Sequence, residues 1–278
     1  MLFRSQTLVN GSGNDLQLGA VETLSVTAAK ALANYRGYQL SLDGLKTLSA
    51  DAATALAAYR GRLSLTGLKR LSPEAEAALA KHEGELALEG LTSLESVELA
   101  TTLGKSSSAL NFPDLSNMTP ETARALVTQR RYGFYPFVWI GGPLQSSPEI
   151  LSALAKGYVS LSGIQSLDES SAVALAEDDA ESQLLLPSLE SLSPAAAAQL
   201  ANRRGGLTLG LKTLSNEAAT ALAAGTARLR LPALTTCPPA GLRALKAMPA
   251  LLVVPPALHT PLERFLWCLT GRAAYVVL

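Results

Sequence analysis

A repeat of about 23 residues runs through most of this chain and constrains its fold more than any other feature. Residues 40–49 and 63–72 read LSLDGLKTLS and LSLTGLKRLS, and residues 86–94 follow the same pattern. The alternation of leucines predicts a short strand with both leucines on one face. Because one repeat of this size cannot bury its own leucines, successive repeats must stack, and their strands are expected to be parallel.

An alanine-rich helix is predicted between consecutive strands, as in residues 51–58. Each helix follows a Ser, Thr or Asp, whose side chain can accept a hydrogen bond from a free backbone N–H at the helix start. Proline followed by glutamate comes next at 73–74, 120–121 and 148–149. Proline loses no hydrogen bond there, and the acid complements the partial positive charge of the helix end. The same frame recurs from Leu16 onwards and predicts about twelve repeats.

These features resemble the leucine-rich repeat family, and the resemblance covers almost the whole chain. It implies an α/β fold, a leucine-rich-repeat-type solenoid with one curved parallel sheet on the concave side and helices on the convex side. The chain departs from the family at one point. The family has an asparagine or cysteine after the strand that bonds neighbouring loops, whereas leucines lie near that place here, at Leu45, Leu68 and Leu91. The repeat therefore resembles a bacterial-type variant of the family, and other groups must make the hydrogen bonds between its loops.

The repeat predicts a single domain over 1–278, with an N-terminal cap over 1–15 and a degenerate C-terminal repeat or cap over 256–278. Residues 274–278 have the sequence of an apolar strand, and an open strand edge can recruit other chains. Either residues 262–267 form a helix that shields this edge, or the edge pairs with a second copy. We expect a monomer rather than a homodimer.

The composition favours a globular protein with a large core and little charge bias. Apolar residues make up 48% of the chain, and 23 basic residues balance 23 acidic ones. This excludes low-complexity disorder and predicts no general attraction to nucleic acid or to anionic membranes. Arg203 and Arg204 are expected on a solvated helix end. A signal peptide and a membrane-length apolar run are not visible, which predicts a cytoplasmic protein, with the reservation that a trimmed chain would look the same.

The residues that usually carry catalysis or metal binding do not form motifs in this sequence. His82 and His259 have no Ser or Cys partner at motif spacing, and His82 is expected to be exposed. Cys237 and Cys268 lack metal-ligand spacing, and Cys237 is expected to be buried where other repeats carry a leucine. Phosphate-binding loops and serine elbows are also absent from the sequence. We therefore expect no enzymatic activity, no metal and no cofactor.

Two functions remain open, and the residues that point outward from the sheet should distinguish them. A scaffold that binds a protein or peptide should expose large side chains, whereas a structural spacer, or a segment of a larger array, should expose small ones. The first repeats carry small residues at the outward positions, namely Ser41, Ser64 and Ala87. The middle repeats carry aromatic residues there, which favours binding.

The candidate binding site comes from the aromatic segment 132–139, which holds five of the fourteen aromatic residues. The spacing to the helix-starting Ser147 predicts that Val138 and Ile140 point inward. The outward residues then form a candidate patch on the concave face: Phe137, Trp139 and Tyr158. Two alternatives stay open, because residues 129–136 could fold over these rings as a local core, or the strand register could differ.

Overall fold

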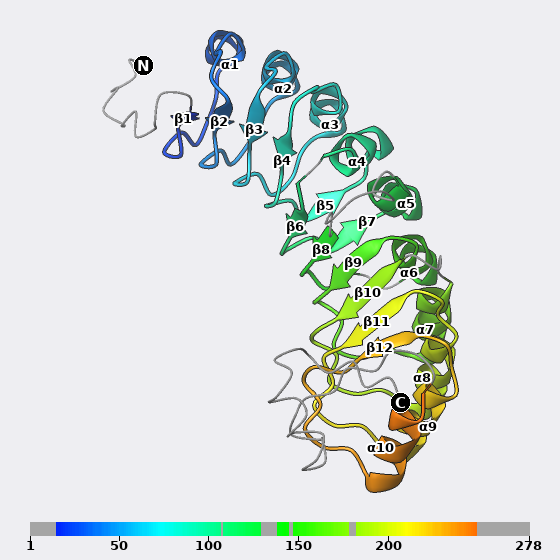
Figure 1. Ribbon diagram of the computed structural model, residues 1–278. Coiled ribbons are helices and arrows are strands. Elements are labelled where there is room, and N and C mark those ends of the chain that lie inside the picture. The colour runs from blue at the N-terminus through cyan, green and yellow to red at the C-terminus, as the bar shows by residue number, and fades with distance from the viewer. Residues whose placement is uncertain (1–14, 107, 129–137, 145–146, 178–181, 249–278) are drawn as a thin grey trace. The chain divides into compact units, whose positions relative to one another are not determined.

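The computed structural model describes residues 15–248, except 107, 129–137, 145–146 and 178–181 (Figure 1). In this part of the chain helices alternate with short strands, and the strand pairs are parallel, so the fold is α/β. The chain divides into two compact units, Met1–Gly142 and Pro143–Leu278. The predicted C-terminal cap and residues 1–14 of the predicted N-terminal cap lie outside the described residues. A single domain over 1–278 stays a prediction.

The first unit holds a four-stranded parallel sheet and five helices among its described residues. The sheet has the order β1-β2-β3-β4, and Leu16, Leu40, Leu63 and Leu86 lie side by side across it. In Figure 1 these strands lie on one side of the unit and the helices on the other. The elements are, in order, β1 (Asp15–Gln17), α1 (Val26–Ala33), β2 (Gln39–Ser41), α2 (Ala50–Ala57), β3 (Arg62–Ser64), α3 (Pro73–Leu79), β4 (Leu86–Ala87), β5 (Ser93–Leu94), α4 (Val97–Gly104), β6 (Leu110–Phe112), β7 (Asn117–Met118), α5 (Pro120–Thr128) and β8 (Val138–Ile140).

The second unit repeats the arrangement with strands that pair in the order of the sequence. Leu184 pairs with Val159 on one side and with Leu207 on the other, and Leu207 pairs with Leu229. Each helix packs against the next one along the chain. The elements are α6 (Pro148–Ala155), β9 (Tyr158–Leu161), α7 (Glu169–Ala176), β10 (Gln183–Leu186), α8 (Pro194–Ala201), β11 (Gly206–Leu209), α9 (Asn216–Ala223), β12 (Arg228–Arg230) and α10 (Pro239–Lys246).

The core of each unit consists of strand leucines packed against helix alanines. In the repeat that contains β2 and α2, Leu40, Leu42 and Leu45 are fully buried, and so are Ala52 and Ala53. Each buried leucine contributes about 1.5–3 kcal/mol. Alanine has no bulk beyond its methyl group, so the helix layer can lie close to the sheet. The predicted inward leucines and the predicted small helix face are both confirmed.

The predicted helix starts are confirmed as well. Ser49 accepts a hydrogen bond from the Ala52 N–H at 3.3 Å, and Ser72 accepts one from the Ala75 N–H at 3.2 Å. The same cap opens helices of the second unit, where Asp168 accepts from the Ser171 N–H at 2.7 Å. Such a cap contributes about 1 kcal/mol and marks the start of its helix, whereas α10 begins after Pro238 without a side-chain cap.

On the sheet surface of the first unit, Asp43 ties two repeats together. Its carboxylate accepts hydrogen bonds from the hydroxyls of Ser41 (2.5 Å) and Ser64 (2.6 Å) and from the Thr66 N–H (3.0 Å). Burial raises the pKa of Asp43, but these bonds outweigh it and leave the pKa below its usual value. Ser41 and Ser64 were predicted at outward positions of the sheet; both are buried there and donate to this carboxylate.

Side chains at one position after the helix make hydrogen bonds to the preceding repeat. We call it the return position; its N–H donates to the carbonyl of the helix leucine three residues earlier, as Tyr59 does to Leu56. The Tyr59 hydroxyl donates to the carbonyl of Gly37 in the preceding repeat at 2.8 Å. Backbone carbonyls of one repeat therefore gain a partner from the helix return of the next, in addition to bonds after the strands such as that from the Thr92 N–H to the Lys69 carbonyl.

His82 occupies the next return position, and the expectation that it is exposed is wrong. Only 4% of the residue is exposed, and its ring stacks on Tyr59 with centroids 6.4 Å apart. The two ring nitrogens face the carbonyls of Gly61 (3.1 Å) and Ala57 (3.4 Å). The histidine is buried because a side chain at this position fills the space between successive helix returns.

Arg203 occupies the return position after α8, and the expectation that it is solvated is also wrong. The residue is fully buried. Its guanidinium donates to the carbonyls of Leu175 and Ala155 and to the Ser182 hydroxyl, the last at 2.9 Å. One side chain thus connects the ends of α6 and α7 to the start of β10, whereas its neighbour Arg204 is exposed as predicted.

Cys237 is half-buried rather than buried, at the position where other repeats carry a core leucine. Burial raises the pKa of its thiol. Among the described residues, helices do not reach the length and apolarity needed to cross a membrane.

Candidate functional site

The predicted aromatic patch is described only in part. Trp139 lies on β8 between Val138 and Ile140, which are 1% and 0% exposed, so the predicted inward pair is confirmed. Trp139 itself is 49% exposed. Phe137 lies outside the described residues, and Tyr158 starts β9 in the second unit, where it is half-buried. A joint patch of Phe137, Trp139 and Tyr158 therefore stays a prediction.

A second candidate site arises where one extra residue interrupts the repeat. Seven positions separate Leu65 from the capping Ser72, but eight separate Leu88 from the capping Ser96. When Leu94 is aligned with Leu71, the extra residue is Glu95. Because the strand is fixed by its neighbour, an insertion after it must displace the helix that follows.

The displacement divides this repeat between two stacks inside the first unit. Its strand β4 stays paired with β3, but its helix α4 packs closely on α5 and only slightly on α3. The extra short strand β5 pairs with β7, at Ser93 with Asn117 and Leu94 with Met118. β4 and β6 belong to different sheets, so the expectation of one uninterrupted sheet is wrong within this unit.

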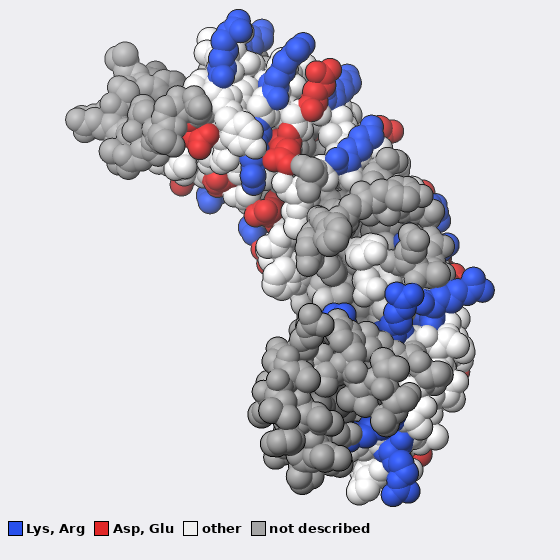
Figure 2. Space-filling model, viewed as in Figure 1, with Lys and Arg blue, Asp and Glu red and all other residues white. Residues whose placement is uncertain are grey.

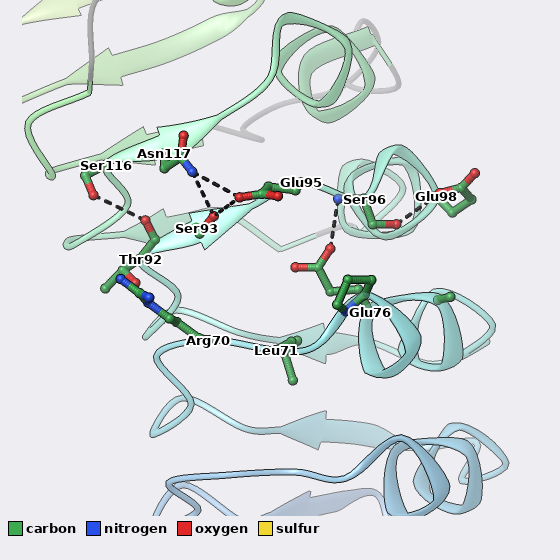
Figure 3. Close-up of a pocket in the computed structure, with 12 residues that line it drawn as sticks. Arg70, Leu71, Glu76, Thr92, Ser93, Glu95, Ser96, Glu98, Ser116 and Asn117 are labelled. Carbon is green, nitrogen blue, oxygen red and sulfur yellow. Dashed lines mark hydrogen bonds between the residues drawn. The ribbon is translucent and has the colours of Figure 1, made fainter.

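The opening between α3 and α4 forms a pocket of about 770 Å³, which we call the α3–α4 pocket (Figure 3). One wall comes from the segment before α3 and from α3 itself, and the other from β5, β7 and the start of α4. Most of the lining side chains are polar, unlike the alanines between regularly packed helices. The pocket is lined by Arg70, Leu71, Pro73, Glu76, Ala77, Thr92, Ser93, Glu95, Ser96, Glu98, Ser116 and Asn117.

Glu76 is the most buried polar side chain of this pocket, with 5% exposed. It stands four residues after the capping Ser72, where the preceding helix carries the buried Ala53 four residues after Ser49. Its Oε2 accepts a hydrogen bond from the Ser96 N–H at 2.8 Å, across the opening. In Figure 3 the other carboxylate oxygen points into the pocket. A carboxylate thus replaces a core alanine at the place where α3 and α4 separate.

The environment of Glu76 raises the pKa of its carboxyl group. Burial is the main cause, and the hydrogen bond from the Ser96 N–H opposes it. The negative charge of Glu95 across the opening adds to the increase.

The opposite wall holds two glutamates, each with one carboxylate oxygen hydrogen-bonded to neighbouring side chains. Glu95 Oε1 accepts hydrogen bonds from the Ser93 hydroxyl and from the Asn117 side-chain amide, both at 3.0 Å. Glu98 Oε2 accepts one from the Ser96 hydroxyl at 3.0 Å. Within the described residues the ion pairs are Arg62–Glu85 and Lys69–Asp114, so the three glutamates of the pocket take part in none.

Substitution of Glu76 tests this electrostatic description. Because the pKa of Glu76 is raised in the folded protein, ionisation is easier in the unfolded chain, and the folded state loses stability as the pH rises above about 4.5. Glu76→Gln keeps an oxygen acceptor for the Ser96 N–H and removes the charge. We expect the variant to become increasingly more stable than the wild type as the pH rises from 4 to 7, measured as the free energy of urea unfolding. A difference that stays constant over this range would contradict the description.

The charges of the first unit are mixed elsewhere on its surface. Figure 2 shows basic and acidic side chains interspersed over the first unit on the face in view. Among the residues that the structure describes, groups of three or more His, Cys, Asp or Glu that could hold a metal ion do not occur. A second pocket, of about 580 Å³, has two basic and two acidic residues in its lining, whereas the lining of the α3–α4 pocket has three glutamates and one arginine.

Comparison with known proteins adds no assignment to this geometry. A scan against models of protein families found no match, and a search of the curated proteins also found none. The resemblance to leucine-rich repeats rests on the sequence pattern, and it stays a prediction.

The α3–α4 pocket was not predicted, although the sequence carries two signals for it. The first is the extra residue before Ser96, and the second is Glu76 at an alanine position. Each signal alone is explained by a loop insertion or by a solvated helix face. Only the structure shows that both act on the same space.

Proposed function

We propose that this protein is a non-enzymatic binding scaffold, a leucine-rich-repeat-type solenoid that holds a protein or peptide partner on the concave face of its sheet. The parallel strand register, the buried Leu-x-Leu pairs and the helices on the other side of each sheet support this proposal. Stacked repeats expose a long sheet surface that suits an extended partner.

The exposure of Trp139 is the observation that carries the proposal. A tryptophan in the middle of a strand is 49% exposed while both neighbours are buried. Large aromatic surface in contact with water is unfavourable, and tryptophan is enriched among the residues that dominate binding energy. A partner that covers this ring would gain that energy.

The spacer alternative is supported by the first strands of the sheet. There the small Ser41 and Ser64 are buried, and they donate to Asp43 within the same surface. A surface that satisfies its own hydrogen bonds gives a partner little to bind. A binding scaffold should therefore contact a partner at Trp139, whereas a spacer should not.

A photo-crosslinking amino acid in place of Trp139 tests the proposal. We expect it to capture one defined protein from a lysate of the native host, identified by mass spectrometry. Trp139→Ala should then weaken binding of that purified protein by about tenfold or more, the loss typical of a hot-spot residue, with little change in melting temperature.

The matched control is the same amino acid in place of Val173, which is 41% exposed on α7. Equal capture from both positions would support a spacer. A melting temperature that falls by several degrees in Trp139→Ala, with unchanged binding, would place the ring in a local core instead.

A further inference from the structure

We propose that the α3–α4 pocket binds a basic side chain of the protein partner, the guanidinium group of an arginine or the ammonium group of a lysine. The proposal rests on the proposed binding function and names the chemistry of one contact. The contact lies in the gap of the helix layer, and its residues are separate from Trp139.

The strongest reason is the buried charge of Glu76. Carboxylates are almost never buried to this extent without a partner of opposite charge, because removal from water is costly. Glu76 Oε2 accepts a hydrogen bond from the Ser96 N–H, but Glu76 forms no ion pair among the described residues. Its second carboxylate oxygen points into the pocket. A cation placed in the pocket would offset this cost.

The second reason is that the wall opposite Glu76 carries further negative charge. Glu95 and Glu98 each have one oxygen hydrogen-bonded to a neighbouring hydroxyl or amide, which leaves the second oxygen of each for a ligand. In Figure 3 Glu76 and Glu95 come from the two sides of the opening. The lining includes one arginine, Arg70, against three glutamates, which favours a cation over an anion.

The third reason is the shape of the pocket and the kind of cation it suits. Its volume of about 770 Å³ is that of a ligand site, and it is too large for a bare metal ion alone. Hydroxyls and an amide from Ser93, Ser116 and Asn117 lie beside the carboxylates. Guanidinium and ammonium groups carry several N–H donors and match such a set of acceptors.

The origin of the pocket agrees with a binding role. Two departures from the repeat, Glu76 in place of alanine and the additional Glu95, meet in one space. The helices α3 and α4 pack only slightly on each other here, and both departures bring in a carboxylate. A regular repeat would close this gap with alanine.

The test uses the full-length chain at low ionic strength with defined small probes. N-acetylarginine amide and N-acetyllysine amide are titrated and followed by amide NMR spectra, with N-acetylcitrulline amide as the uncharged isostere of the first. We expect shifts at Ser93, Glu95, Ser96 and Asn117 with at least one of the two cationic probes and none of similar size with citrulline. Equal shifts with citrulline, or no saturable binding of either cationic probe, would overturn the proposal.

Charge-removing variants assign the effect to the pocket. Glu76→Gln and Glu95→Gln should each weaken binding of the cationic probe by about tenfold, because each removes one charge–charge contact of a partly buried cation. Glu95 is exposed, so Glu95→Gln removes a pocket charge without changing the core. Glu121→Gln, at the exposed start of α5, is the control and should bind as the wild type. Unchanged affinity in both pocket variants would refute the site.

A last arm separates a partner side chain from a free organic amine. Spermidine that binds in the pocket when neither amino-acid probe does would replace the proposal with a polyamine site. Loss of probe binding in the pocket variants, with unchanged capture at the Trp139 position, would support this inference on its own. Failure of the Trp139 capture alone would refute only the proposed function of the sheet face.

Discussion

Arg203→Ala is expected to lower the free energy of unfolding by about 3–5 kcal/mol. The side chain is fully buried and donates to Leu175, Ala155 and Ser182. Truncation leaves these buried acceptors without their donor and opens a cavity at the return position. The loss should appear in urea unfolding as a lower midpoint.

Two further variants identify which property of Arg203 matters. Arg203→Lys keeps the charge but loses the planar group that reaches several acceptors, so it should recover only part of the lost stability. Arg243→Ala removes an exposed arginine from α10 and should change stability by less than about 0.5 kcal/mol. Equal effects of Arg203→Ala and Arg243→Ala would show that the buried hydrogen bonds contribute little.

The regular part of the fold could be predicted from the sequence because its causes are local and repeated. Alternating leucines determine which strand face is buried, and a capping residue, most often serine, determines where most of the helices start. Leu40 and Leu63 pair as predicted, and Ser49 and Ser72 cap as predicted. A wrong assignment of strand face or helix start in one repeat can also be corrected by comparison with the next repeat.

The return position could not be predicted because its role depends on the neighbouring repeat. Tyr59, His82 and Arg203 are different residue types, and each would suit a solvated helix end. Their burial follows from acceptors in the preceding repeats, such as Gly37 for Tyr59 and Ala155 for Arg203. A pattern within one repeat carries no information about such contacts.

The two candidate sites differ in the same way, because one depends on a local pattern and the other on two repeats together. The exposure of Trp139 follows from the two-residue periodicity of a strand and was predicted. The α3–α4 pocket follows from an insertion in one repeat and a substitution in the previous one. Their combined effect depends on how far α4 moves, which the sequence pattern does not give.

Successive turns approach each other closely through their backbones, and Gly67 shows it directly. A Cβ atom at Gly67 would overlap the carbonyl oxygen of Asp43 and lie 2.8 Å from that of Leu45, both in the preceding repeat. The atoms it meets belong to the backbone, so a side-chain rotation cannot relieve the overlap. Gly44 and Gly90 meet the preceding turn in the same way.

Gly67→Ala is therefore expected to reduce the free energy of unfolding by about 2–3 kcal/mol, the cost of forcing an extra carbon into a packed contact. Urea unfolding measures the loss. Gly19→Ala is the matched control, because a Cβ at Gly19 meets nothing within 4 Å. That change should be neutral or slightly stabilising, since alanine restricts the unfolded chain more than glycine does. If both alanine variants unfold at the same urea concentration, the spacing of the repeats is set by the packing of leucines and alanines and not by the turns.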